Sequence, residues 1–99
     1  MRILALEQPV PGAPAGAFEP FLHEEAACVW SLYREGVIRE IYFRAECREA
    51  VLIMEARDAE EATEILATLP LVREKLIAFE VIPLVSYSGF ERLVQPPAP

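Results

Sequence analysis

The chain has 99 residues, 54% of them hydrophobic, and its 9 basic and 16 acidic residues give a net charge of −7. A chain of this length folds as one compact domain and leaves no room for a second independent one. The negative charge argues against nucleic acid and anionic membranes as partners, and no apolar run approaches the ~18 residues of a membrane span, so we expect a cytoplasmic protein.

Metal and redox chemistry have little support in the composition. The two cysteines, Cys28 and Cys47, lack the spacing pattern of a disulfide framework or a zinc site, so we expect plain thiols. His23 is the single histidine, which leaves only carboxylates to complete a metal site within one subunit. Nothing resembles a phosphate-binding glycine loop or a dinucleotide-binding motif. We therefore expect no metal and no cofactor.

The first third of the chain predicts a strand, a long loop and a helix. Residues 2–8 form a short apolar run, which ends in the prolines and glycines of residues 9–16. Over residues 18–35 the apolar side chains recur at every third or fourth position, which places them on one stripe of a helix. The neighbouring acids Glu24 and Glu25 are most simply a solvated face near the positive N-terminus of that helix.

Two strands follow, and their pairing can be predicted. Residues 37–44 combine β-branched and aromatic side chains, and residues 50–56 follow after a short polar turn. The hairpin register that brings opposite charges together places Arg39 opposite Glu55. In that register one face of the sheet carries Ile38, Glu40, Tyr42 and Arg44 against Ala50, Leu52 and Met54.

The next segment predicts a second helix and a last strand. Asp58 and Glu61 have the spacing of a capping box, so a helix begins there, and Pro70 ends it. Residues 79–85 form the last strand. The resulting order, β-α-β-β-α-β, predicts a ferredoxin-like α+β fold, in which helices cover one face of a four-stranded antiparallel sheet.

The uncovered sheet face and the C-terminal tail both predict self-association. We expect one domain over residues 1–85 and a tail over residues 86–99. Ile38, Leu52 and Met54 would face water on the uncovered face, so we expect two sheets to pack face to face in a homodimer. Apolar residues recur at every third position of the tail, and we expect them to pack on the partner subunit: Tyr87, Phe90 and Leu93.

A longer run of residues resembles a known family. The segment 30–44, from Trp30 to Arg44, followed by residues 50–55 and 69–71, is similar to the muconolactone isomerase-like group of the ferredoxin-like dimeric α+β-barrel superfamily. The resemblance extends over residues 1–93. It implies a homodimer with a pocket for a small apolar or aromatic ligand in each subunit. The superfamily includes isomerases, cofactor-independent monooxygenases and polyketide cyclases, so the resemblance is more specific for the fold than for the activity.

Two titratable residues are candidates for catalytic proton transfer. Glu40 lies on a strand that we expect to be covered on both sides, where burial would raise its pKa toward the range useful at neutral pH. The alternative is an ion pair with Arg44 or with an arginine of the partner subunit. His23 lies beside the apolar stripe of the first helix, where it is either a general base or a solvated or backbone-bonded histidine.

Four residues are candidates for holding a ligand. Trp30 suits the wall of a pocket for an aromatic molecule, although a lone tryptophan on a helix is more often a core or interface residue. Tyr42 can donate a hydrogen bond to a carbonyl. Arg39 and Arg44 can bind a substrate carboxylate, unless Glu55 holds Arg39 as the predicted hairpin implies.

Three functions remain open on the sequence. In the first, the protein is a cofactor-independent isomerase that shifts a proton in a small lactone or unsaturated acid. In the second, it is a non-catalytic dimer that binds or senses a small apolar molecule, or serves as an accessory subunit. In the third, every charged residue belongs to an interface network and no pocket exists. A cavity that contains a titratable group would favour the first function.

Overall fold

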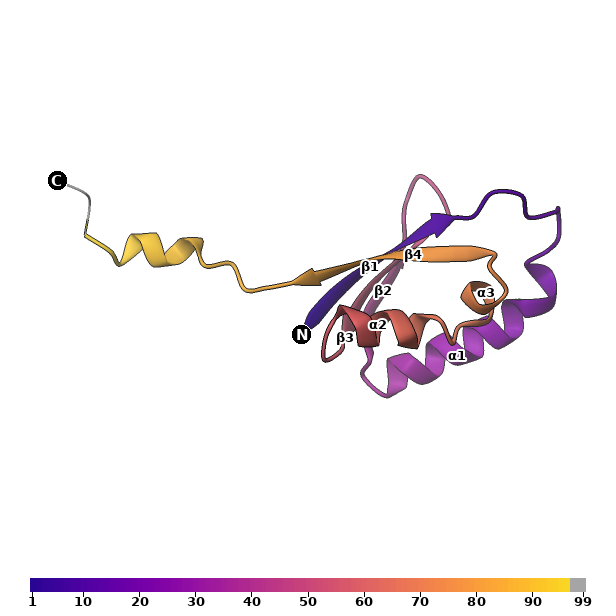
Figure 1. Cartoon of the computed structure of the whole chain (residues 1–99), viewed down its shortest axis with the longest axis horizontal. Helices are drawn as coiled ribbons and strands as arrows, with labels where there is room; N and C mark the ends of the chain where they lie inside the picture. The colour runs from indigo at the N-terminus through magenta and orange to yellow at the C-terminus, as the bar shows by residue number, and fades with distance from the viewer. Residues whose placement is uncertain (97–99) are drawn as a thin grey trace.

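A four-stranded antiparallel sheet with helices on one face makes up the domain (Figure 1). The computed structural model describes residues 1–96, and the strand order is β2-β3-β1-β4. The predicted ferredoxin-like α+β fold is confirmed. In chain order the elements are β1 (Arg2–Pro9), η1 (Glu19–Phe21), α1 (Leu22–Arg34), β2 (Ile38–Phe43), β3 (Ala50–Glu55), α2 (Ala59–Leu66), α3 (Pro70–Arg73), β4 (Ile77–Leu84) and η2 (Gly89–Leu93).

Local sequence signals account for the ends of the short helices. Asp58 caps α2 by accepting a hydrogen bond from the backbone N–H of Glu61 at 2.8 Å, and the Glu61 carboxylate accepts from the backbone N–H of Arg57 at 2.9 Å. Because α2 ends at Leu66, the prediction that Pro70 ends it is wrong. Pro70 instead begins α3, since a proline at the first helical position loses no hydrogen bond. In the described part of the chain, no helix combines the length and apolar character that a membrane span requires.

The pairing of β2 with β3 differs from the predicted register by one residue. Tyr42 lies opposite Val51, and a bulge between Ile38 and Glu40 interrupts the ladder. The bulge matters because successive side chains of a strand point to opposite faces of the sheet, and one extra residue reverses this alternation. Ile38 and Ile41 consequently lie on the same face, the one that α1 covers.

The partners of Glu55 belong to β1 and to the N-terminus, and not to β2 as predicted. Its carboxylate accepts a hydrogen bond from Nε of Arg2 at 3.2 Å and lies 3.4 Å from the N-terminal amine of Met1. Arg2 faces Glu55 across the β1–β3 pair. The predicted Arg39–Glu55 pair is wrong, because the bulge removes Arg39 from the ladder.

The core lies between the sheet and the helices. Ile38, Leu52 and Met54 are each at most 1% exposed, so the prediction that they face water on the open side is wrong. The three side chains share one face of the sheet, as predicted, with Ile38 opposite Met54. The helices pack on that face, whereas the prediction left it uncovered. The opposite face carries another, half-buried apolar set, which no described helix covers (Figure 1): Leu4, Leu6, Val51, Ile53 and Ile82.

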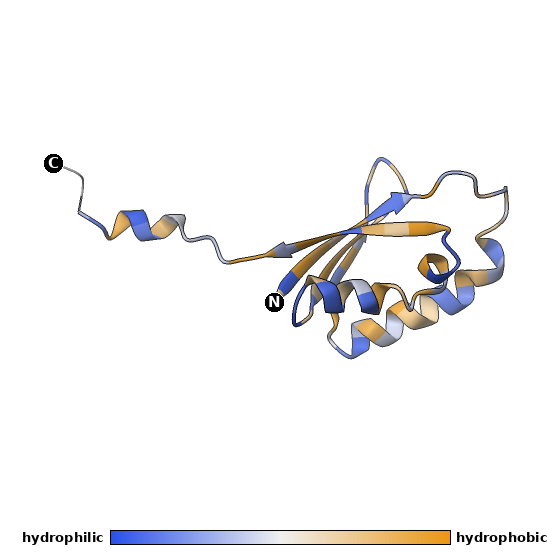
Figure 2. Cartoon of the chain, in the orientation of Figure 1, coloured by the Kyte–Doolittle hydropathy of each residue, from blue (hydrophilic) through white to orange (hydrophobic). Residues whose placement is uncertain are grey.

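The C-terminal tail extends away from the domain (Figure 1). Its apolar side chains are exposed, with fractions of 73% for Tyr87, 71% for Phe90 and 81% for Leu93, and Figure 2 shows both orange and blue segments on η2. The rings of Tyr87 and Phe90 contact each other edge to face, with centroids 5.0 Å apart. Packing of this tail on a partner subunit stays a prediction, and its part over residues 97–99 lies outside the described residues.

Candidate functional site

A cavity of about 270 Å³ lies between α1 and the sheet, and we call it the inner cavity. Helix α1 contributes one side of the wall with residues spaced by three and four positions, as its amphipathic pattern requires. Two carboxylates, those of Glu7 on β1 and Glu25 on α1, also line the cavity. The remaining wall is apolar and consists of Leu22, Ala26, Val29, Ile41, Phe43, Ala50, Leu52, Leu69, Leu71, Ile77 and Phe79.

Glu25 is held at the inner cavity by a hydrogen bond to the backbone of α3. Its Oε1 accepts from the N–H of Leu71 at 2.9 Å, and the side chain is half-buried. Burial raises the pKa of the Glu25 carboxyl above its ordinary value, the hydrogen bond from Leu71 opposes this rise, and the negative charge of Glu7 adds to it. Its neighbour Glu24 is exposed and forms an ion pair with Arg73 at 3.3 Å. The predicted solvated face therefore holds for Glu24 and is wrong for Glu25.

Glu7 has a similar environment on the other side of the cavity. Its Oε1 accepts a hydrogen bond from the N–H of Ala50, the first residue of β3, at 3.0 Å. Burial raises the pKa of the Glu7 carboxyl, the hydrogen bond from Ala50 opposes the rise, and the charge of Glu49 adds to it. Each carboxylate thus has one oxygen fixed by a backbone N–H, which leaves the other oxygen for proton exchange.

These features are those of a general acid–base site. An apolar wall favours the neutral form of a carboxyl group, and two acids of like charge disfavour joint ionisation. Each carboxyl group can therefore exchange a proton with a molecule in the cavity. Such groups suit proton removal from a carbon next to a carbonyl, a reaction that requires no metal or redox cofactor.

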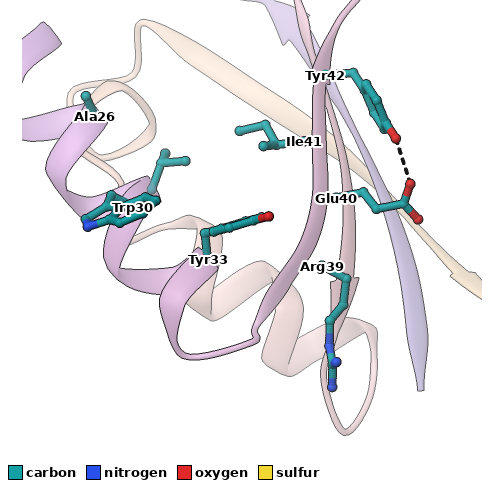
Figure 3. Close-up of a pocket in the computed structure, with 8 residues that line it drawn as sticks. Ala26, Trp30, Tyr33, Arg39, Glu40, Ile41 and Tyr42 are labelled. Carbon is teal, nitrogen blue, oxygen red and sulfur yellow. Dashed lines mark hydrogen bonds between the residues drawn. The ribbon is translucent and has the colours of Figure 1, made fainter.

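A second, more open depression of about 530 Å³ lies beside the inner cavity, where α1 meets the edge strand β2. We call it the outer depression, and Figure 3 shows its lining side chains. Four of the predicted site residues lie together here: Trp30, Arg39, Glu40 and Tyr42. The other lining residues are Ala26, Val29, Tyr33 and Ile41.

Glu40 and Tyr42 form a pair that points away from α1 (Figure 3). The hydroxyl of Tyr42 donates a hydrogen bond to Oε1 of Glu40 at 2.7 Å, and this bond raises the pKa of the Tyr42 phenol. Both side chains are exposed in the single chain. In the single chain β2 is an edge strand and the two residues lie on the open side of the sheet. Burial of Glu40 by a partner sheet stays a prediction.

The structure does not bring His23 or Arg44 into either space. His23 is exposed on the first turn of α1 and lines neither the inner cavity nor the outer depression. Arg44 forms ion pairs with Glu46 and, at 3.7 Å, with Glu49 in the turn after β2. The predicted alternative of a Glu40–Arg44 pair is therefore wrong.

Sequence reasoning missed both acids of the inner cavity. Glu25 lies three residues after Leu22 and four before Val29, so its position on the apolar stripe of α1 was a readable signal. Glu7 lies two residues after the buried Ala5, and strand alternation places it on the same face. Both acids occupy positions that helix or strand periodicity places on the buried face. This pattern is the sequence signal that identifies them.

Comparison with known proteins agrees with the predicted resemblance. The family model described as muconolactone delta-isomerase matches residues 6–89, a range that includes both Glu7 and Glu25. The chain belongs to the muconolactone delta-isomerase family.

The crystal structure of a muconolactone isomerase superimposes with a TM-score of 0.69 at 23% sequence identity. The match covers 90% of this chain and 93% of that chain, and at this identity it establishes a shared fold. No curated protein matches the sequence.

Proposed function

We propose that the protein is a cofactor-independent isomerase, which moves a double bond in a small lactone or unsaturated acid. The observation that carries the proposal is the pair of half-buried carboxylates, Glu7 and Glu25, in one apolar cavity. Membership of the muconolactone delta-isomerase family supports the same reaction class. The proposal keeps the reaction expected from the sequence and moves the acid–base role from Glu40 and His23 to the inner cavity.

The reaction proceeds by two proton transfers at carbon. One carboxylate removes a proton from the carbon between the carbonyl and the double bond, which breaks a C–H bond and forms a dienolate. The same group, now protonated, returns the proton to the far carbon of the former double bond, so that the product is an isomer of the substrate. The second carboxyl, in its protonated form, donates a hydrogen bond to the carbonyl oxygen, where negative charge develops.

Turnover of a β,γ-unsaturated γ-lactone by matched glutamine variants tests this assignment. Glu25→Gln and Glu7→Gln keep the acceptor for the backbone N–H and lose the exchangeable proton, so each should lower kcat by about 100-fold or more. Glu24→Gln, the same change one position earlier on α1, is the control and should retain activity, because Glu24 is exposed and lies outside the cavity wall.

Two further variants distinguish the competing assignments. A larger loss in Glu40→Gln or His23→Ala than in Glu25→Gln would return the proton-transfer role to the residues first predicted. Binding of the lactone by the wild-type protein without turnover would favour the alternative function, a non-catalytic ligand-binding, sensing or accessory dimer.

We also propose that the active form is a homodimer in the cytoplasm. The open sheet face carries an apolar stripe that includes Leu4, Ile53 and Ile82, and packing it against a second copy would remove this stripe from water. The exposed tail, with Tyr87 and Phe90, would pack on the same partner. Sedimentation equilibrium at micromolar concentration is expected to give twice the chain mass, and a stable monomer would contradict the proposal.

A further inference from the structure

The outer depression and the inner cavity are neighbours that share part of their walls. Ala26, Val29 and Ile41 line both spaces, and Figure 3 shows the Ile41 side chain directed from β2 toward α1. The outer depression, at about 530 Å³, is the larger of the two, compared with about 270 Å³ for the inner cavity. The two spaces therefore adjoin along the Ile41 side chain.

Two neighbouring aromatic rings line the outer depression. Trp30 and Tyr33 lie one turn apart on α1, with ring centroids 6.0 Å apart and an interplanar angle of 19°. Their exposed fractions are 59% and 46%, so both rings remain accessible beside the depression. Aromatic rings of this kind stack on other planar groups, and the apolar area that they expose favours such an occupant.

Arg39 is the basic residue that lines the outer depression, and its guanidinium lies beside Gly36 at the turn between α1 and β2. The bulge in β2 takes Arg39 out of the strand ladder, and its guanidinium forms no ion pair with another residue within the range 1–96. The one acid of the lining, Glu40, accepts the hydrogen bond of Tyr42 on the side of the strand away from α1 (Figure 3). A guanidinium without a carboxylate partner is well suited to a planar anionic group such as a carboxylate.

We infer that the outer depression is a second subsite of the same binding site, which takes the aryl carboxylate end of an extended substrate. The inference rests on the proposed function, because it places the reacting lactone or unsaturated acid in the inner cavity. Trp30 and Tyr33 stack on the aryl ring, and Arg39 pairs with its carboxylate. The substrate is then a two-part molecule that is larger than a simple monocyclic lactone.

Binding of two matched lactones to the Glu25→Gln protein tests the subsite without interference from turnover. One probe is a β,γ-unsaturated γ-lactone that carries a methyl group, and the other carries a para-carboxyphenyl group at the same carbon. Calorimetry should show that the aryl acid binds at least about tenfold more tightly, since stacking and a charge-assisted pair are added. Adding Arg39→Met should reduce this ratio of affinities by about tenfold, and adding Trp30→Ala should reduce it as well. Arg34→Met, a matched charge removal at the end of α1 outside the lining of the depression, should preserve the ratio.

The outcomes separate this inference from the proposed isomerase. If both lactones bind equally, or if Arg39→Met and Arg34→Met have the same effect on the ratio, the second subsite is contradicted, whatever the turnover of the methyl lactone. If the aryl acid binds with the expected dependence on Arg39 but the wild-type protein turns over neither lactone, the subsite is supported and the isomerase is contradicted. Failure of the aryl acid to bind at millimolar concentration would overturn the subsite.

Discussion

Glu25 and Glu40 lie on two neighbouring elements, α1 and β2, and their surroundings differ. Glu25 is half-buried among apolar side chains, accepts one backbone hydrogen bond and has a raised pKa. Glu40 is exposed at the sheet edge and accepts a hydrogen bond from Tyr42. Burial among apolar side chains favours the protonated form of Glu25, which is why we propose acid–base chemistry at the inner cavity and recognition at the outer depression.

The largest loss of stability is expected when a buried side chain of the inner cavity wall is shortened. Leu52 is 1% exposed whereas Ile41, on the shared wall, is 41% exposed. Leu52→Ala should lower the free energy of unfolding by ~2–5 kcal/mol, because it leaves a void in the core. Ile41→Ala should cost about 1 kcal/mol, since less of its area is removed from water. Urea denaturation at one fixed protein concentration measures both, and equal losses would contradict the difference in burial between the two side chains.

The pH dependence of stability should have opposite signs for two acids. The raised pKa of Glu25 means that its contribution to stability is full below the ordinary value of 4.5 and is lost as the pH rises through the folded-state pKa. The hydrogen bond from Arg2 and the N-terminal amine hold the pKa of Glu55 below 4.5, so its contribution is present above that pH and is lost as the pH falls through the folded-state pKa.

Thermal denaturation of two glutamine variants checks these signs. The difference in Tm, variant minus wild type, should be more positive for Glu25→Gln at pH 7 than at pH 4, because the variant removes a half-buried charge. The same difference should be more negative for Glu55→Gln at pH 7 than at low pH, because the variant removes the charge that pairs with Arg2 and the N-terminal amine. The same trend for both variants would contradict the assigned environments.

The smallest effect concerns the register of the hairpin. Arg2 donates to Glu55, whereas Arg39 lies in the bulge. In double-mutant cycles on unfolding, Arg2→Met and Glu55→Gln should therefore be non-additive, and Arg39→Met and Glu55→Gln should be additive. A coupling energy between Arg39 and Glu55 would instead support the register that the sequence predicts.

Much of the fold could be predicted because its signals are local. The capping pair Asp58 and Glu61 marks the start of α2 through contacts within one turn. The register of β2 could not be predicted in this way. The bulge allows both Ile38 and Ile41 to face α1, and this advantage exists only once the helix is packed on the sheet.

The candidate site could be predicted only in part for a related reason. The sequence indicated six candidate site residues, and four of them line the outer depression, whereas His23 and Arg44 do not: Trp30, Arg39, Glu40 and Tyr42. It did not identify Glu7 and Glu25, because the burial of an acid depends on the backbone N–H groups that approach it. Leu71 and Ala50 supply those groups from distant parts of the chain.

The proton affinities of the two cavity acids test the central claim most directly. Carbon-13 NMR titration of labelled glutamate carboxyls, assigned with Glu7→Gln and Glu25→Gln, measures them in the folded protein. We predict that Glu7 and Glu25 titrate above the ordinary value of 4.5, and that Glu7→Gln lowers the pKa of Glu25 by removing a neighbouring negative charge. Titration of Glu25 at or below 4.5, with no response to Glu7→Gln, would contradict the account.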